Sequence, residues 1–434
     1  MKIALISPER RFSTNIPQLH ELYDKLSGLR TYLRLWYGIS PSPALPILAS
    51  LTPDSCDVKF VDENIEDIDF SVHYDLVGIS GMTSQAPRIY QIAEKFRAYG
   101  VVVVVGGIHA TVLPEEVKNY ADSVVIGEAE YLWPDIIHDV QKGRIKPFYR
   151  SKEPIDMKHS PIPKYELFTP GNYPIVSVQT SRGCPHDCNF CVASKVYGQK
   201  YRVKDIEQVL EEVACIRKYL RSTHVLFADD NLFATREYAK RLLRELIPMR
   251  IRWLGTSDIS IANDPELLEL MKQSGCVSIY IGLESLSADT LRTVDRHGWK
   301  FRQLSNYSAY VRRIQDHGIG VVGSFVAGFD NDTIQIFDDI ENFVIDNDLL
   351  AAIVLILSPL PGSRLRKTWE QQGRYMSSDW SEYTLENLTF IPKLISSVEF
   401  KDRLARLYEK IYSDEVSLKR TKYFCDVMVN RRRK

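Results

Sequence analysis

Long hydrophobic runs and a secretion signal are both missing from this 434-residue sequence. Its longest apolar run, Leu349–Leu357, is far shorter than the ~20 residues that a membrane-spanning helix needs. Charged residues soon follow the short apolar stretch Ile3–Ile6, which is not the pattern of a signal peptide. We therefore expect a cytoplasmic protein without a transmembrane segment.

An excess of charge is missing as well. The sequence has 55 Lys and Arg residues against 56 Asp and Glu residues, so its net charge is −1. Proteins that mainly coat nucleic acid instead carry a large basic excess. The balance predicts no nucleic-acid partner, and it suits an enzyme that acts on a small molecule.

A disulfide framework is absent too, because the seven cysteines are odd in number and the cytoplasm keeps thiols reduced. Four of them are scattered singly and are expected to be small buried side chains: Cys56, Cys215, Cys276 and Cys425. The other three, Cys184, Cys188 and Cys191, form one C-x3-C-x2-C run. This crowding is the strongest chemical signal in the chain.

Residues 1–142 alternate short Val- and Ile-rich runs with helical patterns, which is typical of strands buried on both faces of a parallel sheet. The predicted strands are Lys2–Ser7, Asp57–Asp62, Leu76–Ser80, Val101–Gly106 and Ser123–Ile126. We expect a doubly wound, flavodoxin-like α/β domain. The helix-like stretch Leu19–Trp36 interrupts the spacing and is interpreted as an insertion over the sheet edge.

A proline-rich segment, residues 143–174, predicts a linker or strap before a second βα series in residues 175–370. Six strands are predicted in that series: Ile175–Gln179, His224–Phe227, Arg252–Thr256, Ser278–Ile281, Val321–Phe325 and Ile353–Leu357. Six βα units indicate a partial (β/α)6 barrel of the TIM type rather than a closed barrel of eight. Residues 371–434 are expected to form a small C-terminal cap.

The cysteine run follows the first barrel strand, at the barrel end where active sites form. Three thiolates on one loop can each hold one iron of a four-iron cluster and leave the fourth iron open to a ligand. A structural zinc commonly takes two separated pairs of ligands, and a second pair is missing, although His186 lies inside the loop. An electron-transfer cluster would need a fourth cysteine, for which Cys215 and Cys276 lie in helix or helix-end contexts.

The three cysteines, with Phe190 before the last of them, resemble the signature of the radical S-adenosylmethionine (SAM) superfamily. Four further segments at predicted strand ends are similar to stretches of that family: Phe227–Phe233, Ile281–Ser285, Gly320–Gly328 and Ser358–Ser363. The resemblance implies that Cys184, Cys188 and Cys191 hold a catalytic [4Fe-4S] cluster. Its open iron would bind SAM, and one electron would cleave SAM into methionine and a 5′-deoxyadenosyl radical. An electron donor such as flavodoxin or ferredoxin is then required.

The same resemblance assigns candidate SAM contacts. The backbone around Phe190 would meet the adenine. Glu284 and Ser257 would bond the ribose hydroxyls or the methionine amine, and Asp229 or Asp230 would bond that amine.

The strand ends of the first domain show no G-x-G-x-x-G after the first strand, so a dinucleotide is not expected. Three segments instead resemble the cobalamin-binding domain of cobalamin-dependent radical SAM enzymes: Val77–Thr83, Val105–Glu116 and Val125–Glu130. The resemblance implies cobalamin contacts at Ser80, Gly81, Thr83, Gly106, Gly107, His109, Gly127 and Glu128. The D-x-H-x-x-G motif that supplies an axial histidine is absent. His109 is expected near the corrin edge rather than below the cobalt.

Three functions follow. The first is a cobalamin-dependent radical SAM methyltransferase that methylates an unactivated carbon of a small molecule. The second is a radical cyclase or rearrangement enzyme resembling the anaerobic magnesium-protoporphyrin ester cyclase. The third is a non-catalytic iron–sulfur protein.

Overall fold

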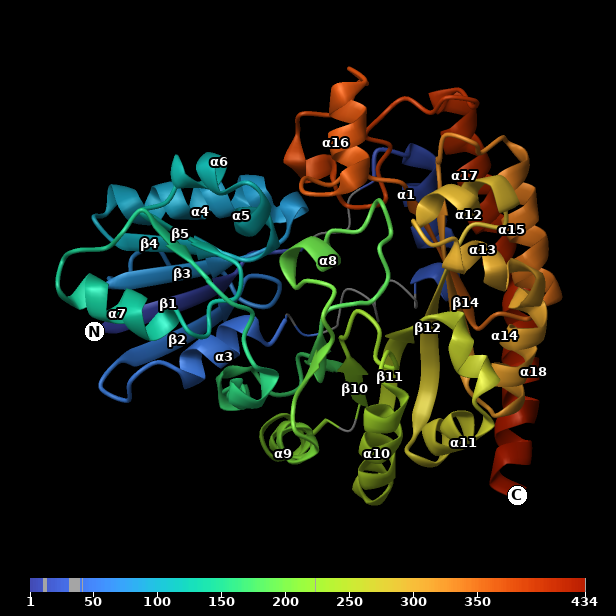
Figure 1. Ribbon diagram of the computed structural model, residues 1–434, viewed down its shortest axis with the longest axis horizontal. Helices are drawn as coiled ribbons and strands as arrows, with labels where there is room; N and C mark the ends of the chain where they lie inside the picture. The colour runs from blue at the N-terminus through green and yellow to red at the C-terminus, as the bar shows by residue number, and fades with distance from the viewer. Residues whose placement is uncertain (11–13, 31–39, 41, 223, 434) are drawn as a thin grey trace.

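Two parallel sheets lie side by side in the computed structural model, each covered by helices (Figure 1). The structure describes residues 1–10, 14–30, 40, 42–222 and 224–433. The blue-to-teal sheet belongs to the first part of the chain, and the second sheet runs from green to orange. The predicted α/β fold class, with two successive sheets, is confirmed.

The first sheet has the strand order β2-β1-β3-β4-β5-β6, with every neighbouring pair parallel. Its strands are β1 (Lys2–Ser7), β2 (Asp57–Asp62), β3 (Leu76–Ser80), β4 (Val102–Gly106), β5 (Ser123–Ile126) and β6 (Phe148–Arg150). Its helices are α3 (Ala44–Ser50), α4 (Ala86–Ala98), α5 (Ile108–Val112), α6 (Pro114–Lys118) and α7 (Trp133–Gln141). The order reverses between β1 and β3, where doubly wound sheets bind ligands. The sequence analysis missed β6, which comes from the predicted linker.

The second sheet has the order β7-β10-β11-β12-β13-β14, again all parallel, and β7 and β14 form its edges among the described residues. This open sheet confirms the partial barrel. Its strands are β7 (Val176–Val178), β10 (His224–Phe227), β11 (Arg252–Ser257), β12 (Cys276–Glu284), β13 (Gly320–Ala327) and β14 (Ala351–Ile356). A small antiparallel pair, β8 (Ser181–Arg182) with β9 (Arg202–Val203), flanks the cysteine run.

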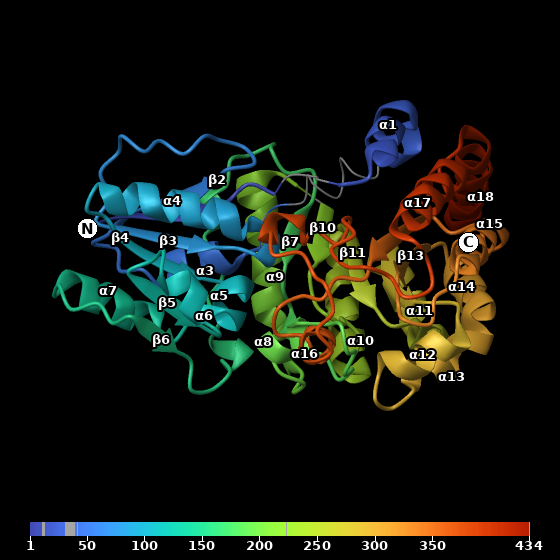
Figure 2. The same cartoon turned by 90° about the horizontal axis from the view of Figure 1, so that it is seen from above.

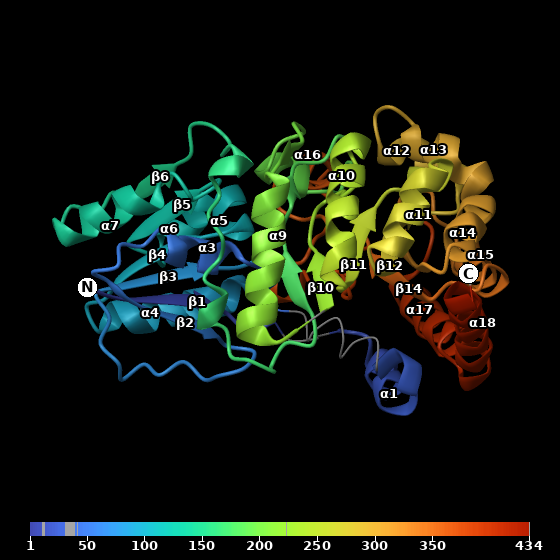
Figure 3. The ribbon, with the colours of Figure 1, turned by 90° about the horizontal axis from the view of Figure 1, so that it is seen from below.

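The second sheet has its own helices, several of which line its outer side (Figure 3). They are α8 (Ala193–Val196), α9 (Ile206–Cys215), α10 (Arg236–Leu246), α11 (Pro265–Gln273), α12 (Ala288–Val294), α13 (Trp299–Gln303), α14 (Tyr307–Asp316), α15 (Gln335–Asp346) and α16 (Arg364–Gln371). Apolar residues recur along one face of several of them. In α10, for example, Leu242, Leu243 and Leu246 are buried against the sheet.

The last part of the chain divides into two. Its helices α17 (Ser397–Ile411) and α18 (Asp414–Arg433) cover the β14 edge, where the Tyr412 hydroxyl donates to the Ala352 carbonyl oxygen at 2.9 Å. A short turn of helix, Trp380–Glu382, instead reaches the helices of the first domain. Among the described residues, no helix combines the length and the apolar character needed to cross a membrane.

The predicted insertion at Leu19–Trp36 lies elsewhere than expected. Its described part includes α1 (Pro17–Lys25), which packs against α17 at the far side of the barrel, away from the first sheet (Figure 2). Leu19 and Leu22 are buried in that contact region. Residues 31–36 lie outside the described residues.

Candidate active site

The cysteine loop runs from β8 to α8. Cys184, Cys188 and Cys191 are partly buried, and none forms a disulfide. The loop turns at Gly183, which has a φ of 93°, and a Cβ added there would clash with the Lys200 carbonyl oxygen. Within the described residues, no three Cys, His, Asp or Glu side chains are grouped to hold one metal ion. Three thiols on one loop fit a cluster better, because each then binds a separate iron.

The partly buried thiols of this loop resist ionisation on their own. Burial raises the pKa of Cys184 to about 11 and that of Cys188 to about 12, while the positive charge of Lys300 opposes both shifts. A bound metal deprotonates a coordinating thiol outright. The donor set therefore suits a site whose metal supplies the missing positive charge.

Lys300 forms a buried ion pair beside the loop. Its Nζ lies 2.9 Å from the Oε1 of Glu284 and donates to the Gly282 carbonyl oxygen at 2.5 Å. Glu284 has a φ of 65° and sits where the pairing of β12 with β13 shifts register. The predicted SAM contact Glu284 is thus already paired with Lys300, a residue that the sequence analysis did not single out.

The two aspartates after β10 have different surroundings. Asp229 is buried, and its Oδ1 accepts from the Thr180 N–H at 3.0 Å and from the Ser181 hydroxyl at 2.6 Å, while burial raises its pKa to about 7. Asp229 therefore joins the ends of β10 and β7. Asp230 is exposed and accepts a hydrogen bond from the Gly183 backbone, next to Cys184. Of the two carboxylates predicted to meet the SAM amine, Asp230 is the more accessible.

The remaining residues predicted around SAM are already in contact with protein groups. Ser257 is buried and donates to the Asp258 carbonyl oxygen at 2.9 Å, and Phe190 packs edge-on against Phe329. His186, considered above as a zinc ligand, places its Nε2 3.1 Å from the Asp258 carboxylate. Their roles toward SAM stay predictions.

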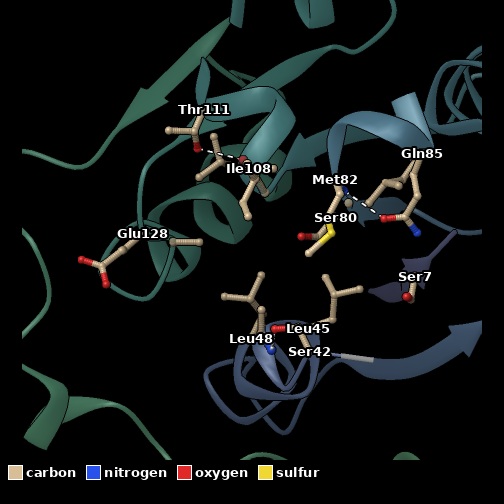
Figure 4. A pocket seen from close by; sticks show the side chains of 18 of the residues that line it. Ser7, Ser42, Leu45, Leu48, Ser80, Met82, Gln85, Ile108, Thr111 and Glu128 are labelled. Carbon is tan, nitrogen blue, oxygen red and sulfur yellow. Dashed lines mark hydrogen bonds between the residues drawn. The ribbon is translucent and has the colours of Figure 1, made fainter. Parts of the chain in front are cut away.

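A cavity of about 350 Å³ opens at the carboxyl ends of the strands of the first sheet. This volume lies in the usual range for small-molecule sites. Six of the eight predicted cobalamin contacts line it: Ser80, Gly81, Gly106, Gly107, Gly127 and Glu128. Figure 4 shows Met82 pointing into this space opposite Leu45 and Leu48 of α3, three lining residues that the sequence analysis missed.

Thr83 and His109 are not among the lining residues of this cavity. His109 is buried among the helices, with its Nε2 2.8 Å from the Tyr90 hydroxyl, and its place near the corrin edge stays a prediction. Its ring also packs edge-on against the ring of Trp380, with the two ring centroids 5.6 Å apart. Burial lowers the pKa of His109 to about 4, so its ring is neutral at physiological pH.

Gly107 forms part of the cavity floor. Its φ is 94°, and a Cβ added there would lie 2.8 Å from the Gly81 carbonyl oxygen and 2.8 Å from the Ser80 hydroxyl. The ends of β3 and β4 thus approach each other through backbone alone, which leaves a smooth surface for a large ligand. These residues fit the predicted cobalamin.

Replacement of Gly107 by alanine is expected to weaken cobalamin binding by about tenfold or more, since left-handed strain and the clash together cost roughly 1–3 kcal/mol. Titration of the purified chain with hydroxocobalamin measures the affinity. Gly100→Ala is the matched control, because Gly100 also has a positive φ, of 76°, but has open space around its Cβ. Equal affinity in the Gly107→Ala variant and the wild type would refute the placement.

Buried ion pairs join the cavity to the cysteine loop. Arg182, two residues before Cys184, lies 2.7 Å from Glu128 and 2.6 Å from Glu130, and Arg202 lies 3.0 Å from Glu128. Glu128 and Glu130 follow β5 of the first domain, whereas both arginines belong to the second. Because Arg182, Glu128 and Glu130 all line the cavity, the two predicted cofactor sites are adjacent.

Comparison with known families agrees with this arrangement. The family model of the radical SAM superfamily matches residues 178–344, and that of the B12 binding domain matches residues 36–137. The chain thus carries a radical SAM domain, with a B12-binding domain ahead of it. It is therefore an enzyme, as predicted. Its cofactors are a [4Fe-4S] cluster and SAM for the radical SAM domain and cobalamin for the B12-binding domain.

Named relatives match this chain along most of their own length. Bacteriochlorophyllide d C-12(1)-methyltransferase from Chlorobaculum tepidum is 29% identical over 89% of this chain and 87% of its own. Hopanoid C-2 methylase from Rhodopseudomonas palustris is 28% identical over 88% of this chain and 73% of its own.

A solved structure shows the same fold. The radical SAM methyltransferase TsrM from Kitasatospora setae, with cobalamin and a [4Fe-4S] cluster bound, superposes with a TM-score of 0.66 at 15% identity. The match covers 95% of this chain and 88% of that one.

Proposed function

We propose that this chain is a cobalamin-dependent radical SAM methyltransferase that methylates an unactivated carbon of a small molecule. The observation that carries the proposal is the position of Arg182. This one residue lines the cavity of the first domain and lies two positions before the first cysteine of the loop. A methyl group held in the cavity and a radical formed at the loop would therefore act in neighbouring spaces.

Each part of the site has a task in this proposal. When bound, the cluster and SAM supply a 5′-deoxyadenosyl radical, and cobalamin supplies a methyl carrier. Cys184, Cys188 and Cys191 hold the cluster, and Asp230 accepts hydrogen bonds from the SAM amine. The bare backbone at Gly107 supports the cobalamin. We place this activity in the cytoplasm, where thiols stay reduced.

For the substrate we infer a large apolar ring system. The relatives named above act, by their names, on a bacteriochlorophyllide and on a hopanoid. A tetrapyrrole and a hopanoid are therefore the first substrates to test.

Anaerobic reconstitution with iron, sulfide and hydroxocobalamin tests the proposal. With methyl-labelled SAM and a strong chemical reductant, we expect 5′-deoxyadenosine and label first in the bound corrinoid and then in the substrate. No 5′-deoxyadenosine under these conditions would refute the proposal.

A cyclase is the second candidate, because an anaerobic magnesium-protoporphyrin IX monomethyl ester cyclase from Rubrivivax gelatinosus is 22% identical over 83% of this chain. Formation of 5′-deoxyadenosine and of a product without label would favour it.

A further inference from the structure

The segment that follows α16 returns to the first domain. Its short helical turn, Trp380–Glu382, packs against α4 and against the helical turn Thr83–Gln85. Figures 1 and 2 both show this orange segment beside the end of α4. The Trp380 ring packs against the apolar core on the α4 side of the first sheet. A residue from the last part of the chain thus contributes to the core of the first domain.

Hydrogen bonds hold Trp380 against the first domain. Its indole Nε1 donates to the Oε1 of Glu116 at 2.7 Å, and the Tyr90 hydroxyl donates to the same oxygen at 2.7 Å. The Tyr90 hydroxyl also lies 2.8 Å from the Nε2 of His109, whose ring packs edge-on against Trp380. These four residues, which we call the Trp380 cluster, join α4, α5 and α6 to the last part of the chain.

Trp380 also has partners in the barrel. The Arg366 guanidinium of α16 lies 4.9 Å from the centre of the Trp380 ring, where the negative face of the ring attracts it. The same guanidinium donates to the Pro359 carbonyl oxygen at 3.1 Å and to the Tyr383 hydroxyl at 3.2 Å. Tyr383 is buried and donates to the Ser377 carbonyl oxygen at 2.7 Å. Trp380 therefore lies between the two domains with specific partners in each.

The elements behind Trp380 are walls of the cobalamin cavity. The turn Thr83–Gln85 lines the cavity with Gln85, and α5 lines it with Ile108 (Figure 4). His109, the next residue of α5, contacts Trp380 instead. The Trp380 cluster thus supports two walls of the cavity from behind.

Helix α5 contacts the barrel a second time, next to the cysteine loop. A Cβ added at Gly362, in the turn after β14, would lie 2.7 Å from a methyl group of Val112 in α5 and 3.8 Å from one of Val192. Val192 directly follows Cys191. One glycine therefore separates a wall of the cobalamin cavity from the loop predicted to hold the cluster. Any shift of α5 would change the spacing between the two predicted cofactor sites.

We propose that Trp380 is a positioning residue of the cobalamin site. It holds the turn Thr83–Gln85 and α5 against the barrel, and it thereby fixes the distance from bound cobalamin to the cysteine loop. Transfer of the methyl group of SAM to the reduced corrinoid, with release of S-adenosylhomocysteine, requires the two sites to lie at this distance. The inference rests on the proposed function, since only a methyl carrier needs this spacing.

The variant Trp380→Ala tests this role in the reconstituted full chain. With methyl-labelled SAM, titanium(III) citrate and saturating hydroxocobalamin, we expect label transfer into the bound corrinoid to slow by about tenfold or more, because small misplacements of reacting groups are costly. Formation of 5′-deoxyadenosine should keep its wild-type rate, since the cysteine loop has its own contacts in the barrel. Titration with hydroxocobalamin alone should show an affinity about tenfold lower, because two cavity walls lose their support.

Substitutions at Glu116 separate the hydrogen bond from the packing. Glu116→Gln keeps a carbonyl oxygen that can accept from both Trp380 and Tyr90, so it should retain wild-type affinity and label transfer. Glu116→Leu keeps a side chain of similar size but removes the acceptor, so it should reproduce part of the loss. Equal behaviour of these two variants would overturn the role of the hydrogen bond.

Tyr375→Ala is the matched control. Tyr375 lies in the same segment as Trp380 and is 66% exposed, so its removal should change neither the two rates nor the affinity. Wild-type affinity and label transfer in Trp380→Ala would overturn the proposal. So would an equal loss of label transfer and of 5′-deoxyadenosine, because Trp380 would then support the barrel and not the cavity walls. If the wild type binds no hydroxocobalamin, or forms no 5′-deoxyadenosine with titanium(III) citrate, the proposed function itself has failed.

Discussion

Replacing Cys188 with alanine is expected to remove both the cluster and all cleavage of SAM. Three thiolates are the smallest set that leaves one iron open, so the loss of one leaves two irons without a protein ligand. Cys188 also holds the backbone of the loop. It forms an isolated antiparallel β-bridge with Asp295, and its carbonyl oxygen accepts from the Cys191 N–H at 3.3 Å. Iron content after anaerobic reconstitution and 5′-deoxyadenosine formed with titanium(III) citrate are the two measurements.

The other cysteines provide the controls for this experiment. Cys215→Ala and Cys276→Ala should keep the full iron content and the rate of SAM cleavage, since both residues lie on elements outside the loop, α9 and β12. Loss of iron in either variant would show a fourth cysteine ligand and would support the electron-transfer cluster. A Cys188→Ala variant that still cleaves SAM would contradict the assignment of the loop.

Local sequence patterns were sufficient to predict most of the strands. The Val- and Ile-rich runs define both parallel sheets within a few residues, because strands buried on both faces have a strong apolar signature. The edge strand β6 was missed, since its three residues, Phe148–Arg150, lie among prolines and have one buried side chain. The glycine pair Gly106–Gly107 was predicted to contact cobalamin, and both glycines line the cavity at the end of β4.

Side-chain partners were much harder to predict than strands. His109 follows the glycine pair, yet the first turn of α5 directs it toward Tyr90 and away from the cavity. Glu284 and Lys300 are 16 positions apart and meet only because α13 packs beside the end of β12. The sequence does not distinguish Asp229 from its neighbour Asp230. Only the packing of β10 beside β7 shows that Asp229 is buried and bonded to protein groups, whereas Asp230 is exposed. Which side chains contact each other depends on tertiary packing, and the spacing of residues along the sequence does not reveal that packing.

Arg182→Met is expected to separate the two domains and to abolish cobalamin binding. The substitution keeps the length of the side chain but leaves Glu128 and Glu130 buried without their common partner. Removal of one partner from a buried ion pair costs about 3–5 kcal/mol, which exceeds the net stability of many domain contacts. We expect faster proteolysis within residues 143–174, loss of hydroxocobalamin binding, and a lower midpoint of urea unfolding.

Companion variants separate charge from packing in this network. Arg182→Lys keeps one positive charge but cannot bridge two carboxylates with a planar fork, so we expect an intermediate loss. Arg182→Met/Glu130→Gln removes one of the orphaned charges and should recover part of the stability, although Arg202 would still hold Glu128 at 3.0 Å. Cobalamin binding unchanged in Arg182→Met would show that the domains are held by their apolar contacts. In that case the adjacency of the two cofactor sites would not depend on the ion pairs across the interface.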